Sequence, residues 1–165
     1  MKNIVLIGMP ACGKSTIGYW LSKKINFPVL DADKYLEEKE NRVISDIFSN
    51  EGEEYFRELE TKYLKELSEK EGTIISTGGG AVKKKENIDI LKKTGIVVFL
   101  DRTIDAISKE NHRNRPLLQN PDNLQKLYDE RIKLYRRYAD IIIKNDDNID
   151  VIVDRIITSL KGKIL

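Results

Sequence analysis

The chain has 165 residues and a mass of 19.0 kDa, a length that predicts one domain spanning residues 1–165. Its 29 basic and 27 acidic side chains leave a formal net charge of +2, which argues against a nucleic-acid binder held by overall charge. A single cysteine excludes an internal disulfide and predicts a reducing, cytoplasmic compartment, and a single histidine excludes a histidine-rich metal site. The longest apolar run, about five residues from Ile96 to Leu100, is too short to cross a bilayer, so we expect no membrane partner.

Apolar runs of strand length alternate with longer helical patterns along the chain, which is typical of βαβ units and a parallel sheet. The sequence predicts five strands, at 3–7, 28–30, 73–77, 96–100 and 139–143. It predicts helices at 14–25, within 34–71, near 86–93, at 122–137 and at 149–161, and a polar loop at 109–121. The fold class is therefore expected to be α/β, with helices on both faces of a five-stranded parallel sheet.

The segment from Gly8 to Ser15, GMPACGKS, is a complete G-x-x-x-x-G-K-[ST] phosphate-binding motif. It follows a predicted strand and opens a predicted helix, as such a loop requires. Its glycines let backbone N–H groups surround phosphate oxygens, and the N-terminus of the following helix favours the same anion. We expect Lys14 to reach the β- and γ-phosphates of a nucleoside triphosphate and the Ser15 hydroxyl to ligate Mg²⁺. The loop residues expected to hold the nucleotide are Gly8, Ala11, Cys12, Gly13, Lys14, Ser15 and Thr16.

Two other side chains near this loop have simple structural interpretations. Cys12 is expected to be a small buried filler, although a thiol beside a helix N-terminus is also a candidate for a reactive thiolate. Trp20, near the middle of the predicted helix, is expected to be a core residue.

Two short segments, one acidic and one of glycines, follow the second and third predicted strands, at the sheet edge where α/β folds place ligands. Of Asp31 and Asp33, one could hold Mg²⁺ and the other could accept a proton from a hydroxyl; alternatively, the pair forms a polar turn and a helix cap. Gly78, Gly79 and Gly80 follow a strand directly, which indicates close approach of the backbone to another group or, alternatively, a flexible turn.

Three arginines are further candidates. Arg57 lies among glutamates at helical spacing, a pattern that an ordinary exposed ion pair also shows. Arg115 lies in the polar loop, in a position to close over phosphates, and Arg131 lies on the next predicted helix. Both are also compatible with surface charge.

Taken together, these segments resemble the shikimate kinases, small relatives of the nucleoside monophosphate kinases. The matching segments, in order, are GMPACGKST (8–16), DAD (31–33), FRELE (56–60), TGGGAV (77–82), RPLL (115–118) and ERIKLY (130–135). The resemblance implies a P-loop NTPase-type three-layer α/β/α fold. It also implies ATP-dependent phosphorylation of the 3-hydroxyl of shikimate to 3-phosphoshikimate, on the route to chorismate and the aromatic amino acids.

The resemblance assigns a role to each matching residue. On the nucleotide side, Lys14 is expected to contact the transferring phosphate, Ser15 and Asp31 to serve Mg²⁺, and Arg115 to belong to a lid, 109–121, that closes over ATP. The family commonly clamps adenine with an arginine and a proline, but the corresponding loop at 144–150, KNDDNID, contains no proline.

On the acceptor side, the resemblance places Asp33 at the shikimate hydroxyls as base or orienting group. Arg57 and Arg131 are expected to hold the carboxylate, with a backbone N–H from Gly79, and Glu60 is expected to steady Arg57. Guanidinium groups pair bidentately with carboxylates, so these residue types suit a carboxylated polyol.

The acceptor-binding segment is expected at 33–60, within a single kinase domain that acts as a monomer. Two alternatives remain open. One is another small-molecule kinase of this fold with a gluconate-like acceptor, and the other is a nucleotide-binding protein without catalysis.

Overall fold

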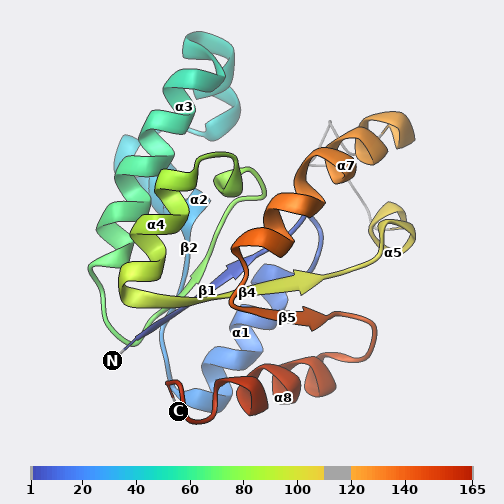
Figure 1. Ribbon diagram of the computed structural model, residues 1–165. Helices are drawn as coiled ribbons and strands as arrows, with labels where there is room; N and C mark the ends of the chain where they lie inside the picture. Colours follow the sequence, from blue (N-terminus) through green and yellow to red (C-terminus); the bar gives the residue numbers. More distant parts are fainter. Residues whose placement is uncertain (1, 110–119, 165) are drawn as a thin grey trace.

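Five mainly apolar segments form one parallel sheet in the computed structural model, which describes residues 2–109 and 120–164 (Figure 1). The strands are β1 (Asn3–Ile7), β2 (Val29–Asp31), β3 (Ile74–Ser76), β4 (Gly95–Asp101) and β5 (Ile141–Lys144), in the order β2-β3-β1-β4-β5. Every residue of the central strand β1 is buried. Both faces of a parallel sheet are normally covered, which explains why the strand Asn3–Ile7 carries no alternation of polar and apolar residues.

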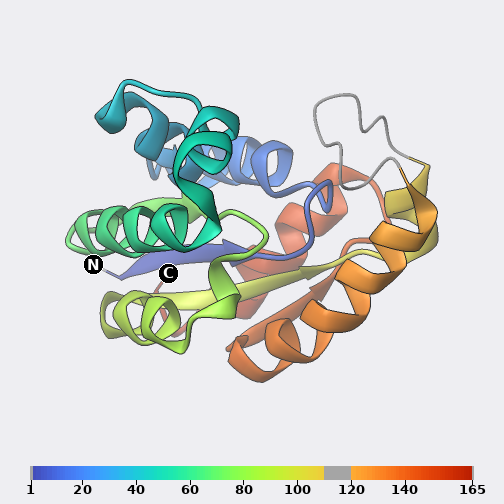
Figure 2. The ribbon, with the colours of Figure 1, turned by 90° about the horizontal axis from the view of Figure 1, so that it is seen from above.

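Helices cover both faces of this sheet, so the predicted three-layer arrangement is confirmed (Figure 1). The helices α1 (Lys14–Ile25) and α8 (Ile149–Leu160) lie on one face, and α3 (Ile44–Ser68), α4 (Lys85–Thr94) and α7 (Pro121–Tyr138) lie on the other. The described residues also form three shorter elements: α2 (Ala32–Glu40), the 3₁₀ turn η1 (Ala81–Lys83) and α5 (Ile104–Ser108). Seen from above, α3 (cyan to green) and α7 (orange) lie on either side of the segment that follows β3 (Figure 2).

The element boundaries differ from the predictions by one or two residues at several places. The fifth strand begins at Ile141 rather than at 139, because Ala139 still caps α7 and donates its N–H to the Tyr135 carbonyl at 3.1 Å. The predicted loop 109–121 ends earlier than expected, because the Asn120 side chain caps α7 and Pro121 opens it. Pro fits the first helical position, where no N–H is needed. Residues 110–119 of that loop lie outside the described residues.

Helix α3 contains a sharp break at Gly52, whose φ of 87° and ψ of 172° are accessible only to glycine. The break bends the N-terminal part of the helix over a small apolar cluster that is separate from the main core. The cluster is formed by Leu36, Ile47, Phe56, Leu59 and Tyr63. Helices α2 and α3 therefore stabilise one another through a core of their own, beside the carboxyl edge of the sheet.

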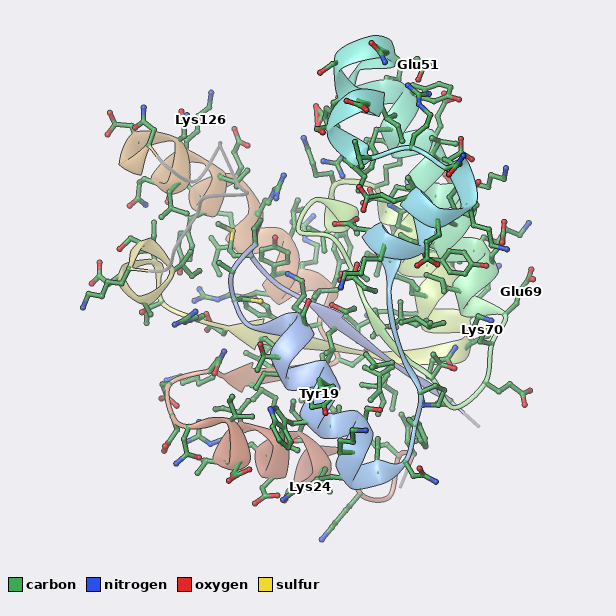
Figure 3. All side chains as sticks on the ribbon, turned by 180° about the vertical axis from the view of Figure 1, so that it is seen from behind. Tyr19, Lys24, Glu51, Glu69, Lys70 and Lys126 are labelled. Atoms are coloured by element: carbon green, nitrogen blue, oxygen red, sulfur yellow. The ribbon has the colours of Figure 1, made fainter. Side chains whose placement is uncertain are left out.

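The interpretation of Trp20 as a core residue is wrong, since its side chain is 47% exposed. The residues of α1 that face the core are Ile17, Gly18 and Leu21, which leaves Trp20 on the outer side with Tyr19. The two rings meet edge to face, with centroids 5.2 Å apart, and Figure 3 shows Tyr19 on the outer face of the helix. Cys12, in contrast, is completely buried, as the filler interpretation predicts.

A helix that crosses a bilayer needs about 20 mainly apolar residues. No helix within residues 2–109 and 120–164 has both that length and that hydropathy.

Candidate active site

A cleft of about 640 Å³ opens at the carboxyl ends of the strands, between the loop after β1, the start of α2, helix α3, the segment after β3 and helix α7. Figure 3 shows the tip of α3, near Glu51, and the first turns of α7, near Lys126, standing apart above this edge. The predicted site residues that line the cleft are Ala11, Gly13, Lys14, Ser15, Thr16, Asp31, Asp33, Arg57, Gly79 and Arg131. Gly8 and Cys12 belong to the same loop without lining the cleft, and Arg115 lies outside the described residues.

The loop between β1 and α1 has the backbone of a phosphate cradle. Gly13 takes a φ of 99°, which favours glycine, and as the N-cap of α1 it brings no side chain to accept from the first N–H groups of the helix. A Cβ on Gly8 would lie 2.6 Å from the Cys12 Sγ, so the loop also requires glycine at that position. The Lys14 ammonium donates to the carbonyls of Gly8 and Met9 at 2.8 and 3.0 Å. The loop thus presents backbone donors and a buried cation to the cleft.

Asp31 and Asp33 have different surroundings although only one residue separates them. The Asp31 Oδ1 accepts hydrogen bonds from the N–H groups of Asp33 and Lys34 at 2.9 and 3.1 Å, so Asp31 caps α2. The Asp33 side chain is partly buried, and this burial raises the pKa of Asp33 to about 6. The neighbouring carboxylates of Glu60 and Asp31 raise this pKa further, whereas the Lys14 ammonium opposes the shift.

Each glycine after β3 lies against a different charged side chain of the cleft. A Cβ on Gly78 would lie 2.8 Å from the Asp33 Oδ1, and one on Gly79 would lie 2.7 Å from Pro10 and 3.0 Å from the Arg131 Nη1. A Cβ on Gly80 would overlap the Arg57 guanidinium. Side chains at these positions would collide with the site, so the glycine run is required for the close approach of three charged groups.

Arg57 forms a partly buried ion pair. The alternative, an ordinary exposed ion pair between residues at helical spacing, does not describe it. Its Nη1 lies 2.9 Å from the Glu60 Oε1, and the Glu60 side chain is only 4% exposed. Burial raises the pKa of Glu60, and the Arg57 charge opposes this shift. A second, weaker contact joins the Arg57 Nη2 to Glu53 at 3.4 Å. The predicted steadying contact between Glu60 and Arg57 is therefore present.

The two arginines also carry hydrogen-bond donors that lack an acceptor in the part of the chain that the structure describes. The Nε atoms of Arg57 and Arg131 are buried and lack a hydrogen-bond partner among residues 2–109 and 120–164. Buried donors are normally satisfied, and an unsatisfied one costs roughly 1–3 kcal/mol. The pair of guanidinium groups is therefore suited to an anionic ligand that reaches into the cleft.

Several residues around the site were not expected from the sequence. The Tyr135 hydroxyl donates to the Gly79 carbonyl at 2.6 Å, and its ring stacks on Phe99 with centroids 5.1 Å apart. Burial raises the pKa of Tyr135, which keeps the hydroxyl protonated as a donor. Tyr135 follows Arg131 by four residues on α7, so helical spacing could have indicated that both face the site. An apolar wall is formed by Ile44, Phe48 and Phe56.

Comparisons with known proteins agree on one family. The model of the shikimate kinase family matches residues 10–161. A shikimate kinase of Clostridium beijerinckii is 45% identical over 159 residues, which cover 94% of each chain. A solved structure of the shikimate kinase of Acinetobacter baumannii, in complex with shikimate, is 33% identical with a TM-score of 0.91, covering 100% of this chain and 96% of that one.

The chain belongs to the shikimate kinase family. It is accordingly a transferase that uses ATP to phosphorylate shikimate, in the biosynthesis of aromatic amino acids. A gluconokinase structure from Sinorhizobium meliloti is also similar, with a TM-score of 0.60, but at 13% identity this likeness extends to the fold alone. The resemblance found in the sequence motifs and the expected P-loop α/β fold are both confirmed.

Proposed function

We propose that the cleft binds ATP on the loop after β1 and shikimate against the glycine run, and that it transfers the γ-phosphoryl group to the shikimate 3-hydroxyl. The observation that carries the proposal is the convergence of Asp33, Arg57 and Arg131 on three consecutive glycines, in the same cleft as Lys14. One domain, 1–165, acts as a cytoplasmic monomer with the acceptor-binding segment at 33–60, and its partners are small molecules rather than nucleic acid or membrane.

The two guanidinium groups are proposed to recognise the shikimate carboxylate. Both border the glycine run, and both have a buried Nε without a described acceptor. Glu60 already balances the charge of Arg57, so the largely buried Arg131 guanidinium supplies the positive charge that attracts one carboxylate. The backbone N–H of Gly79 supplies a further donor, while Phe48 and Phe56 provide an apolar surface for the ring.

Asp33 is proposed as the base for the acceptor hydroxyl. With a pKa of about 6 it is ionised at neutral pH, yet it is more basic than an exposed aspartate. The 3-hydroxyl proton passes to the Asp33 carboxylate as the hydroxyl oxygen bonds to the γ-phosphorus and the bond from phosphorus to the bridging oxygen of ADP breaks. Phosphoryl transfer depends mainly on positioning and charge neutralisation, and Lys14 supplies positive charge beside the phosphates.

Mg²⁺ is proposed to enter with ATP. Among the residues that the structure describes, no group of three or more acidic, histidine or cysteine side chains gathers around a metal site. Mg²⁺ in such enzymes requires only one or two protein oxygens besides phosphates and waters, which the Ser15 hydroxyl and the Asp31 carboxylate can provide from the same cleft. When bound, the ion neutralises negative charge on the phosphate oxygens.

Arg115 and the lid at 109–121 are proposed to close over ATP during transfer. The described cleft is open to solvent between α3 and α7, and water admitted there would compete with shikimate for the phosphoryl group. A cationic lid residue would exclude this water and neutralise the transferring phosphate.

The test is release of ADP from MgATP, measured with shikimate, gluconate, a nucleoside monophosphate or no acceptor. We expect release with shikimate alone. Release with gluconate or the nucleotide would reject the acceptor assignment while keeping the kinase. Absence of acceptor-dependent release from folded protein that binds ATP would reject catalysis.

A further inference from the structure

Two side chains that follow β4 and β5 donate hydrogen bonds to consecutive backbone carbonyls of the phosphate loop. The Arg102 Nη1 donates to the Ala11 carbonyl at 2.9 Å, and the Asn145 Nδ2 donates to the Cys12 carbonyl at 2.6 Å. Arg102 directly follows β4 and Asn145 directly follows β5. The loop is therefore attached to the ends of two strands that contribute nothing to its sequence motif.

The bond from Asn145 fixes the orientation of one phosphate donor. In a trans peptide the carbonyl and the following N–H point in opposite directions, and no peptide bond in the described residues is cis. Because the Cys12 carbonyl is turned toward Asn145, the Gly13 N–H is turned the opposite way. Gly13 lines the cleft and Cys12 does not. The amide of Asn145 thereby aims the Gly13 N–H at the position proposed for the phosphates.

The loop conformation requires such support. Ala11 has a φ of 66°, in the left-handed region that a residue with a Cβ adopts at a cost of roughly 1–2 kcal/mol. Asn145 also packs directly on the loop, since a Cβ on Gly13 would lie 3.0 Å from its Nδ2. A strained backbone persists where its surroundings hold it in place.

Asn145 is itself held firmly. Its N–H donates to the Asp101 carbonyl at 2.9 Å, which extends the pairing of β5 with β4 by one residue. On either side of Asn145, the Arg155 Nη1 donates to the Lys144 carbonyl at 2.9 Å and to the Asp146 Oδ1 at 2.6 Å. The segment at 144–148 is therefore a fixed support for the Asn145 side chain.

We propose that Asn145 is a positioning residue for nucleotide binding, which holds the phosphate loop so that the Gly13 N–H faces the phosphates, with Arg102 supporting the preceding peptide. The inference rests on the proposed binding of ATP to this loop. It concerns the nucleotide alone, because Asn145 does not line the part of the cleft assigned to the acceptor.

The test compares Asn145→Leu, which keeps the approximate size and removes the donor, with Asn145→Gln, which keeps an amide. Thr94→Val is the matched control: it also keeps the approximate size and removes a side-chain donor, because the Thr94 hydroxyl donates to the Ser68 carbonyl at 2.6 Å, and neither residue lines the cleft. The dissociation constant of MgADP is measured by calorimetry, together with the KM values of ATP and shikimate and the melting temperature.

We expect Asn145→Leu to weaken MgADP binding and to raise the KM of ATP by about tenfold, with the KM of shikimate within about twofold of the unmodified chain. Asn145→Gln should recover part of the loss. Thr94→Val should lower the melting temperature while MgADP binding stays unchanged. Equal MgADP binding by Asn145→Leu and the unmodified chain would overturn the inference and leave the proposed function intact. A similar loss of MgADP binding in Thr94→Val would also overturn it, by showing that general loosening of the fold is enough to weaken nucleotide binding. If the unmodified chain binds no nucleotide, the proposed function and the inference both fail.

Discussion

Replacing Asp33 by asparagine should remove turnover and, at the same time, stabilise the protein above pH 6. Burial and neighbouring carboxylates raise the pKa of Asp33 from 3.8 to about 6, so its charged form is disfavoured in the folded protein. A shift of about two units corresponds to roughly 3 kcal/mol. The asparagine loses a favourable charge in the first turn of α2, a loss of roughly 0.5 kcal/mol. The net gain at pH 8 is therefore roughly 2–3 kcal/mol.

The sign of this effect depends on pH. Because the folded pKa of Asp33 lies above its unfolded value, the folded protein binds more protons between about pH 4 and pH 6, and the stability contributed by this group falls as pH rises through that window. Urea unfolding at pH 4 and pH 8 should show a gain from Asp33→Asn at pH 8 and little or none at pH 4.

Turnover of Asp33→Asn should fall at least a hundredfold, whereas MgATP affinity should change little. In the unmodified chain, turnover should decline as pH falls below about 6, because Asp33 then becomes protonated. Normal turnover in the variant would remove Asp33 from the mechanism. Equal stability differences at pH 4 and pH 8 would refute the electrostatic reasoning.

Three other substitutions test separate parts of the account. Arg115→Ala should slow phosphoryl transfer in single-turnover measurements more than it weakens shikimate binding, and an unaltered rate would place the lid cation elsewhere. Gly79→Ala introduces a Cβ 2.7 Å from Pro10 and 3.0 Å from Arg131, so the KM of shikimate should rise by about tenfold or more, and an unchanged KM would contradict the close packing. Gly52→Ala should lower the free energy of unfolding by about 1–3 kcal/mol in urea titrations, because alanine does not adopt a φ of 87° with a ψ of 172°; equal stability would show that the break in α3 is dispensable.

The parts of the fold that could be predicted are those with a local signal. The phosphate loop needs its glycines and lysine within eight consecutive residues, so the motif from Gly8 to Ser15 indicates the structure directly. The buried strands appear as apolar runs. In contrast, α5 covers only five residues, Ile104–Ser108, too few for helical periodicity to show. The expectation for Trp20 is wrong because a large apolar ring favours the core, whereas its position on α1 faces outward.

The candidate site divides in the same way. Residue type and order indicate the charged residues and the glycine run, but they do not indicate how these pair. Gly78 meets Asp33, and Gly80 meets Arg57, only when α2, α3 and the segment after β3 are placed together. The support of the phosphate loop had no local signal at all. Arg102 and Asn145 contact residues that lie 91 and 133 positions away in the chain. Such contacts depend on the order of strands in the sheet, which single-sequence patterns do not specify.

The central claim is that Arg57 and Arg131 recognise the carboxylate of shikimate, and the most direct measurement compares shikimate with its methyl ester. The kcat/KM of each acceptor is measured for the unmodified chain, for Arg57→Ala and for Arg131→Ala. We expect the kcat/KM of the unmodified chain to be at least about a hundredfold higher for shikimate than for the methyl ester. Each substitution should remove most of this preference by lowering the kcat/KM for shikimate alone. Equal use of the two acceptors by the unmodified chain, or a preference that survives both substitutions, would contradict the central claim.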